Sequence, residues 1–258
     1  MAVREPMIRK EPVEEAARTL EAAERAEIPL RLTGGVGVAM ISPSARRPPL
    51  AREYADIDYV APSRAKSKIE RLFVELGYKP EREFNSLHGG RRLFFLDPEN
   101  RREADVFIDA IRGCHNLMLA DRLQLSPHVI TPTDLMLSKL QVVETNKKDF
   151  LDLISLLADH PVVTEDRDGV ISLERVRAVC STDWGWWRTV TTVARETLDV
   201  AGRFVTAGGV SPEALERLKV LIEDLETSPK SRKWKLRARV GDRVRWHEEP
   251  EGLSHSHS

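Results

Sequence analysis

The chain has 258 residues, of which 41% are hydrophobic and 31% are charged, and its formal net charge at pH 7 is −1. This composition is typical of an ordinary globular protein with a sizeable core, and the small net charge excludes a global attraction to nucleic acid or membranes. We expect one domain of catalytic size with a helical annex.

Cysteine use and hydropathy bear on location. Cys114 and Cys180 show neither a CxxC spacing nor a Cys/His metal spacing, which favours buried, reduced thiols in a cytoplasmic protein. The N-terminus has no continuous apolar signal core, and no run approaches the roughly 18 apolar residues of a membrane span. We therefore expect a cytoplasmic location and no membrane partner.

The first elements lead to a pair of glycines. Residues 11–26 are rich in Ala, Glu and Leu and predict a helix, and residues 28–35 predict a short strand that ends at Gly34 and Gly35. Adjacent glycines permit positive φ or a close approach of backbone to ligand, although a simple tight turn is the alternative. Residues 42–52 contain three prolines and predict an irregular loop, in which Arg52 is placed to face a phosphate.

The next strand carries two aspartates. Side chains alternate along an extended strand, so Asp56 and Asp58 share one face while Ile57 points into the core. Two carboxylates so close are costly unless one takes up a proton or a cation lies between them, and a hard divalent ion suits oxygen ligands. This pair predicts a metal site.

A third carboxylate is expected from a neighbouring strand. Residues 63–76 predict a packing helix, and residues 82–88, 91–97 and 103–111 predict a meander of antiparallel strands. In the last of these, Glu103, Asp105, Phe107 and Asp109 share a face. Asp105 is the best candidate because it lies in the middle of its strand.

Beyond Pro127 the sequence predicts helices only. Their ranges are 131–143, 147–160, 172–180, 183–204 and 211–226. Asp149 and Asp152 flank the apolar stripe of the second helix, where charged residues commonly mark the boundary of the stripe. Three tryptophans at 184, 186 and 187 are more typical of packing anchors than of a base-stacking platform.

The C-terminal stretch is strongly basic. Between residues 228 and 246 eight basic side chains and two tryptophans accompany a single acid, Asp242. Such a patch suits phosphate backbones, and a basic tail folded over the acidic surface of its own protein is the alternative. We therefore divide the chain into an α/β core with an N-terminal helix (1–125), a helical domain that completes the site (126–228) and a basic C-terminal tail (229–258).

The glycines and the strand carboxylates together suit a triphosphate and one or two magnesium ions. Backbone amides near Gly34 and Gly35 can approach phosphate oxygens, and carboxylates on adjacent strands can coordinate the metal. The sequence has no GxGxxG fingerprint, no P-loop and no GxSxG elbow, so these alternative sites have no support.

Two segments carry a resemblance to a known family. Gly34-Gly35, followed by Arg52-Glu-Tyr-Ala-Asp56-Ile-Asp58, resembles the GG...RxSxDID signature of the nucleotidyltransferase superfamily, in particular its branch of AbiEii and MenA-type toxins. Lys139, followed by Lys148-Asp149-Phe-Leu-Asp152-Leu, is similar to the K...RDxxDL segment of that branch. The resemblance covers roughly residues 28–158. This chain departs from it at Tyr54 and Lys148, where the family has serine or threonine and arginine.

The resemblance implies an α+β, nucleotidyltransferase-like fold: a mixed β-sheet flanked by helices, as in polymerase β, followed by a C-terminal helical region. It implies that Asp56 and Asp58 are a metal pair and Asp105 the third carboxylate. The phosphate loop would be Gly34-Gly35. It further implies that Lys139 neutralises triphosphate charge, and that Asp149 or Asp152 completes the site from a helix.

The leading hypothesis is a nucleotidyltransferase that depends on Mg²⁺, with two ions expected, and moves a nucleoside monophosphate from an NTP to an acceptor. The basic C-terminal patch favours RNA, tRNA in particular, while protein and small-molecule acceptors stay open. The alternative is a catalytically inactive nucleotidyltransferase-like module that binds nucleotide or RNA. The toxin branch also implies an antitoxin as a possible partner.

Overall fold

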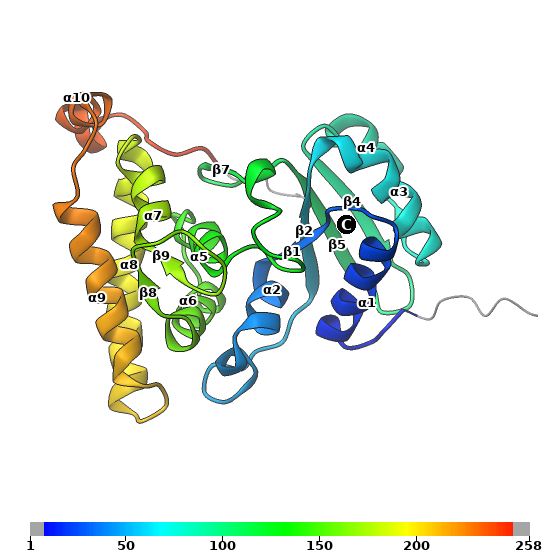
Figure 1. The fold of residues 1–258 in the computed structure, drawn as a ribbon, viewed down its shortest axis with the longest axis horizontal. Coiled ribbons are helices and arrows are strands. Elements are labelled where there is room, and N and C mark those ends of the chain that lie inside the picture. Colours follow the sequence, from blue (N-terminus) through cyan, green and yellow to red (C-terminus); the bar gives the residue numbers. More distant parts are fainter. Residues whose placement is uncertain (1–7, 250–258) are drawn as a thin grey trace, which may run out of the picture.

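A computed structural model describes residues 8–249, as a five-stranded mixed sheet with flanking helices and a following helical region (Figure 1). The expected α+β fold class, a mixed sheet flanked by helices with a helical region after it, is confirmed. The end of the predicted basic tail, residues 250–258, lies outside the described residues.

The sheet has the strand order β1-β2-β5-β4-β3, in which β2 and β5 are parallel and the other neighbours are antiparallel. Its strands are β1 (Arg31–Thr33), β2 (Asp56–Ala61), β3 (Lys79–Pro80), β4 (Arg92–Asp97) and β5 (Arg102–Ile108). A hairpin of β6 (Ala110–Arg112) and β7 (Asn116–Met118) follows β5.

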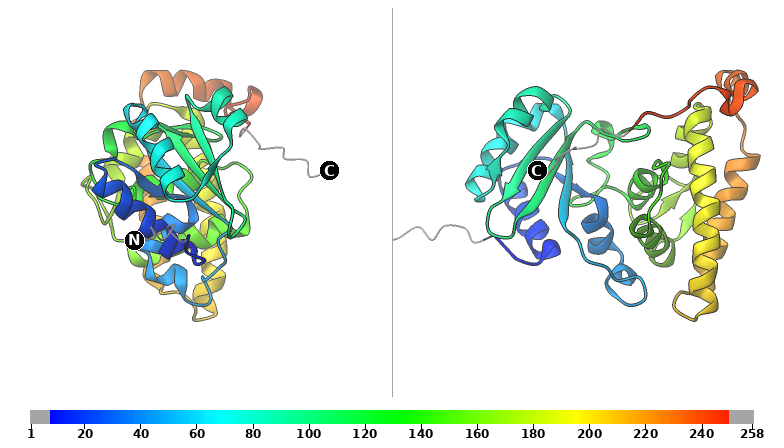
Figure 2. Two further views of the ribbon diagram at one scale, coloured as in Figure 1. Left: turned by 90° about the vertical axis from the view of Figure 1, so that its right-hand side faces the viewer. Right: turned by 180° about the vertical axis from the view of Figure 1, so that it is seen from behind.

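One face of the sheet is covered by α1 (Pro12–Arg25) and α3 (Lys66–Glu75), on the side away from the helical region (Figures 1 and 2). On this face the ring of Phe73 stacks on Phe95 at 4.4 Å between centroids and meets the edge of Tyr59 at 5.6 Å. Because side chains alternate along β2, Asp56 and Asp58 are directed to the opposite face.

The helical region consists of α5 (Pro132–Leu140), α6 (Lys147–Asp159), α7 (Leu173–Cys180), α8 (Trp184–Thr206), α9 (Pro212–Thr227) and α10 (Arg232–Val240). The first five confirm the predicted helices, and each begins at a side-chain N-cap: Thr131, Asn146, Ser172, Asp183 and Ser211. None of the helices within residues 8–249 combines the length and the apolar character that a bilayer crossing demands. Cys114 and Cys180 are buried and unpaired, as expected.

The predicted strand at residues 82–88 is wrong, because this segment forms helix α4 (Arg82–His88). The side-chain amide of Asn85 accepts from the backbone N–H of Phe94 at 2.7 Å and donates to its carbonyl oxygen at 3.1 Å. The Asn85 side chain, together with the backbone N–H of Glu81, thus satisfies the part of β4 that a longer neighbouring strand would otherwise pair. The antiparallel pairing expected for the other two segments, β4 and β5, is confirmed.

Two further segments differ from expectation. Gly34 adopts the positive φ that the glycine pair permits, +64°, and from there the chain continues as α2 (Gly34–Ile41) rather than as a turn alone. The proline-rich loop contains a 3₁₀ turn at Pro43–Arg46. Beyond Pro127 the chain also forms two short parallel strands, β8 (Val162–Val163) and β9 (Ile171–Ser172).

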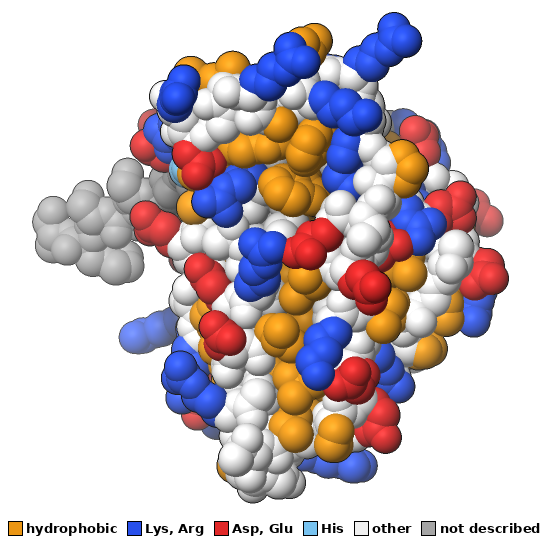
Figure 3. Space-filling model, turned by 90° about the vertical axis from the view of Figure 1, so that its left-hand side faces the viewer, with side chains coloured by type: hydrophobic (Ala, Val, Ile, Leu, Met, Phe, Trp, Pro, Cys, Tyr) orange, Lys and Arg blue, Asp and Glu red, His pale blue; other side chains and the backbone are white. Residues whose placement is uncertain are grey.

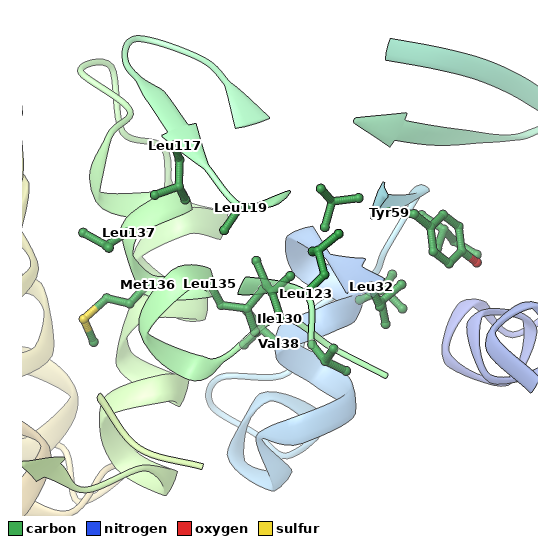
Figure 4. Close-up of a cluster of buried hydrophobic side chains, with 14 of the residues drawn as sticks. Leu32, Val38, Tyr59, Leu117, Leu119, Leu123, Ile130, Leu135, Met136 and Leu137 are labelled. Carbon is green, nitrogen blue, oxygen red and sulfur yellow. The ribbon is translucent and has the colours of Figure 1, made fainter. Parts of the chain in front are cut away.

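A continuous hydrophobic core joins the sheet to the helical region. Leu32 of β1 and Val38 of α2 lie close to Leu135 of α5 in Figure 4, and all three side chains are fully buried. Backbone hydrogen bonds connect Leu32 to His128 and Ile130, so the segment that leads into α5 runs along the edge of β1. The core contains residues from both sides of residue 125. The division of the chain into domains at that residue stays a prediction.

We expect Leu135→Ala to lower the free energy of unfolding by about 2–5 kcal/mol, because it removes buried methyl groups at this junction. All five tryptophans lie between residues 184 and 246, so their fluorescence reports on the helical region while far-UV circular dichroism reports on the whole chain. With one shared core, the two probes should show coincident transitions in the wild type and in the variant. Separate transitions would contradict a shared core.

Candidate active site

The acidic site is built on the parallel pair β2 and β5. Their register places Asp58 directly beside Asp105, and Asp56 beside Glu103. Asp56 is exposed, Asp58 is half-buried and Asp105 is 4% exposed. The strand alternation predicted from sequence therefore holds, and it brings the third carboxylate next to the first two.

The crowding has an electrostatic consequence. Burial, followed by the charges of Asp56 and Asp105, raises the pKa of Asp58 to about 7. Burial also raises the pKa of Asp105, although the positive charge of a nearby arginine opposes the rise. At neutral pH a further positive charge, in addition to that arginine, would therefore be strongly favoured between Asp58 and Asp105.

Arg92 of β4 provides the positive charge that Asp105 receives in this structure. Its Nε lies 2.5 Å from Oδ1 and its Nη2 lies 2.6 Å from Oδ2, which is a bidentate ion pair. Residues 8–249 contain no group of three His, Cys, Asp or Glu side chains arranged to hold a metal ion. The third carboxylate instead points to Arg92.

Gly34 and Gly35 begin α2 directly against this acidic site. A Cβ atom on Gly34 would lie 2.1 Å from Oδ2 of Asp58, and one on Gly35 would lie 1.9 Å from Nη2 of Arg52. The absence of side chains therefore lets the start of the helix approach Asp58 and Arg52. Thr33, the residue before α2, makes no side-chain cap to the helix, and its buried hydroxyl oxygen has no hydrogen-bond partner.

The helical region contributes a compact ionic network. Arg52 donates two hydrogen bonds to Asp152, at 2.9 and 2.8 Å, and its guanidinium lies 4.3 Å from the centre of the Tyr54 ring. Lys139 of α5 lies 2.9 Å from Asp149 and 2.9 Å from Asp152, both of α6. Burial lowers the pKa of Lys139, but the two carboxylates outweigh burial and raise it above its ordinary value.

All nine predicted site residues meet in one region of the molecule. The charge of Lys139 acts on Asp58, while Arg52 connects Gly35 to Asp152, so the sheet cluster and the helix cluster adjoin. Sequence reasoning missed Arg92. The only available signal was that Arg92 is a basic residue in the predicted strand before the strand of Asp105. The register that places Arg92 against Asp105 was not predictable from the sequence pattern.

A cavity of about 1230 Å³ opens beside Arg52 and Tyr54. It extends between the start of α1 and the β4–β5 turn, and Ala55, the neighbour of Asp56, also lines it. Basic and acidic side chains alternate around it, including Lys10, Glu11, Arg46, Glu53, Glu99 and Arg101.

No model of a known protein family matches this chain, and no curated protein matches it. Two solved structures are similar to it in part. The antibiotic-resistance factor ANT(2'')-Ia is 14% identical, with a TM-score of 0.38 over 56% of this chain and 81% of that chain. An antigenic nucleotidyltransferase-like protein from Paracoccidioides brasiliensis is also 14% identical, with a TM-score of 0.43 over 82% of this chain and 95% of that chain. Any activity must therefore be argued from the side chains of the site.

We expect Asp58→Asn to raise the melting temperature more at pH 8 than at pH 5. The ordinary pKa of an unfolded aspartate is about 3.9, whereas the folded value for Asp58 is about 7. Between these values the folded state binds more protons than the unfolded state, so the stability falls as the pH rises. The amide removes this charge penalty.

Asp199→Asn is the matched control, because Asp199 is exposed on α8. Melting temperatures of the two variants and the wild type, measured at both pH values without divalent ions, check the prediction. Equal effects of Asp58→Asn at pH 5 and pH 8 would contradict the raised pKa.

Proposed function

We propose that this chain is a magnesium-dependent nucleotidyltransferase, which moves a nucleoside monophosphate from an NTP to an acceptor. The supporting observation is the placement of Asp58 beside Asp105 on parallel strands, with Asp56 on the same face and the start of α2 against Asp58. The sequence resemblance of these same residues to the nucleotidyltransferase signature agrees with this geometry.

The donor set suits a hard divalent cation. Asp56, Asp58 and Asp105 offer oxygen ligands only. Burial, followed by the charges of Asp56 and Asp105, raises the pKa of Asp58, so a bound cation would favour its charged form. In the proposal Asp56 and Asp58 hold one or two Mg²⁺ ions, and Asp105 joins them when it is released from Arg92, with which it is paired in this structure. When bound, magnesium neutralises charge on the phosphates and on the departing pyrophosphate.

The start of α2 and two cations suit the triphosphate. With Thr33 making no side-chain cap, backbone N–H groups in the first turn of α2 are available to phosphate oxygens, and the helix dipole favours negative charge there. Arg52 and Lys139 lie on the same side of the site and add positive charge. Asp149 and Asp152 hold these two side chains in place.

In the proposed reaction an acceptor hydroxyl oxygen forms a bond to the α-phosphorus. The bond between that phosphorus and the bridging oxygen breaks, and pyrophosphate leaves with the electron pair. In the proposal Asp105, once released from Arg92, receives the proton of the hydroxyl, because burial raises its pKa and it lies beside Asp58.

The acceptor is left open among RNA or tRNA, a protein and a small molecule. The cavity beside Arg52 and Tyr54 reaches Ala55, the neighbour of Asp56, and is large enough for a nucleotide or a small acceptor. The toxin role and an antitoxin partner stay predictions of the sequence resemblance.

We expect Asp58→Asn and Asp56→Asn each to reduce transfer at least about 100-fold, since each removes a charged ligand from the reacting phosphates. The measurement uses the four α-labelled NTPs in turn, with Mg²⁺ and with RNA, protein and small-molecule fractions as acceptors. Asp199→Asn should keep the wild-type rate. Label transfer by Asp58→Asn at the wild-type rate would contradict the proposed site.

The same assay separates the alternative function. A wild-type protein that binds an NTP in calorimetry but labels none of the acceptor fractions would be a nucleotide-binding module rather than an enzyme. The observation that favours this alternative is the ion pair of Arg92 with Asp105, which occupies the third carboxylate.

Arg92 should compete with the metal for Asp105. We expect Arg92→Gln to bind Mn²⁺ about ten-fold more tightly at pH 8, because Asp105 loses its internal positive charge and three carboxylates remain. The apo variant should also be less stable, since a buried carboxylate is left unpaired.

Isothermal titration with Mn²⁺ measures the affinity, and the metal-induced rise in melting temperature provides a second readout. Arg71→Gln is the control, because Arg71 is exposed on α3, which covers the other face of the sheet. Unchanged or weaker metal binding by Arg92→Gln would show that Arg92 does not compete for this site.

A further inference from the structure

A second cavity, of about 510 Å³, lies between the start of α8, helix α10 and the β6–β7 hairpin. None of its lining residues belongs to the acidic site or its ionic network. Four of the five tryptophans of the chain line it: Trp184, Trp186, Trp234 and Trp246. Its volume falls within the range of about 300–1,000 Å³ that is typical of small-ligand sites.

The tryptophans divide into anchors and accessible rings. Trp184 and Trp186 are each 6% exposed, which confirms their expected role as packing anchors. Trp234 and Trp246, from the C-terminal segment, are only half-buried. Trp246 meets Trp184 edge to face at 6.1 Å between centroids, so an accessible aromatic ring is held against a fixed one.

Three basic side chains and two acids, Asp183 and Glu248, line this aromatic cavity. Lys233, Arg237 and Arg245 line it, and no residue of α10 is buried. Figure 3 shows Lys and Arg side chains along α10, with hydrophobic side chains gathered beneath it. The guanidinium of Arg237 lies 4.6 Å from the centre of the Trp184 ring. This cation–π contact fixes the position of the guanidinium.

Most of the positive charge of this segment has no acidic partner in the described part of the folded body. Within residues 8–249, none of the eight basic side chains from residues 230 to 245 forms an ion pair with an acid outside the C-terminal segment. The single acid among them, Asp242, pairs with Arg188 of α8, and Arg245 pairs with the nearby Glu249. The C-terminal segment does fold over its own protein, but within residues 8–249 it is held to α8 mainly by aromatic contacts. A basic tail folded over an acidic surface stays the alternative interpretation.

We propose that this cavity binds unpaired nucleotides of a single-stranded nucleic acid. The half-buried rings of Trp234 and Trp246 provide stacking surfaces for bases, and Lys233 with its basic neighbours provides charge for the phosphates. An anionic membrane would need exposed rings on a convex surface, whereas these rings line a cavity. An acidic peptide would use the charge but would leave the ring faces without a partner.

This site is independent of the proposed transfer reaction, because it involves neither the carboxylates nor a metal. The test therefore omits NTP and divalent ions, so its failure says nothing about nucleotide transfer. It measures the fluorescence anisotropy of a labelled ten-nucleotide oligouridine with the full chain, at several salt concentrations. Its deoxy counterpart and a duplex of the same length complete the set.

We expect both single strands to bind more tightly than the duplex. Tighter binding of the ribose or of the deoxyribose strand decides whether the natural ligand is RNA or DNA. Trp246→Ala should weaken binding about 5-fold to 20-fold, which corresponds to the lower half of the roughly 1–3 kcal/mol per stacked base. Lys233→Gln should weaken binding to a similar extent, because it removes a positive charge that lines the cavity. Lys235→Gln is the matched control, because Lys235 is exposed on the same helix but does not line the cavity. It should weaken binding about two-fold or less.

Three outcomes would overturn the proposal. Equal losses for Lys233→Gln and Lys235→Gln, with wild-type binding by Trp246→Ala, would leave only diffuse electrostatic attraction. Equal or tighter binding of the duplex would exclude recognition of unpaired bases. Binding to phosphatidylserine vesicles but to neither oligonucleotide would make this surface a membrane contact.

Discussion

The parallel pairing of β2 with β5 is the constraint on which the rest of the site depends. It places Asp58 beside Asp105 and keeps Asp56 on the same face, so three acids share a small region. Such an arrangement is unfavourable by itself, as the raised pKa of Asp58 shows. The surrounding structure supplies positive charge from three directions: Arg92 from β4, Lys139 from α5 and Arg52 from the loop before β2.

The ionic network between Arg52, Lys139, Asp149 and Asp152 fixes geometry more than it stabilises the fold. Burying such groups costs desolvation energy that their attraction only roughly repays. The network fixes the positions of two cations, Arg52 and Lys139, that come from two different segments. Asp152 pairs with both Arg52 and Lys139, and Lys139 pairs with both Asp149 and Asp152. Neither Asp152 nor Lys139 can therefore turn away without leaving a buried charge unpaired.

The local features of the site were predictable from sequence, whereas its pairings were not. Alternation along a strand is enough to place Asp56 and Asp58 on one face, and cap residues such as Ser211 mark helix starts. The register that joins Asp105 to Asp58, and the contact of Arg92 with Asp105, depend on which strands become neighbours, and the pattern of one strand contains no such information. The helix at Arg82–His88 escaped prediction because the Asn85 side chain, with the backbone N–H of Glu81, takes the place of a longer paired strand beside β4.

The two groups of charge in this protein differ in how they are balanced. In the acidic site each cation from sheet and helix meets a carboxylate, whereas α10 is held to α8 by ring contacts, such as Trp234 against Trp187 at 5.1 Å, rather than by ion pairs with the folded body. Like charges gathered on one helix repel one another and lower its stability. Arg237 is turned inward onto Trp184, but Arg232, Lys233, Lys235 and Arg239 stay exposed. Attachment through aromatic rings therefore leaves most of the positive charge of the helix facing solvent, where an external anion can balance it.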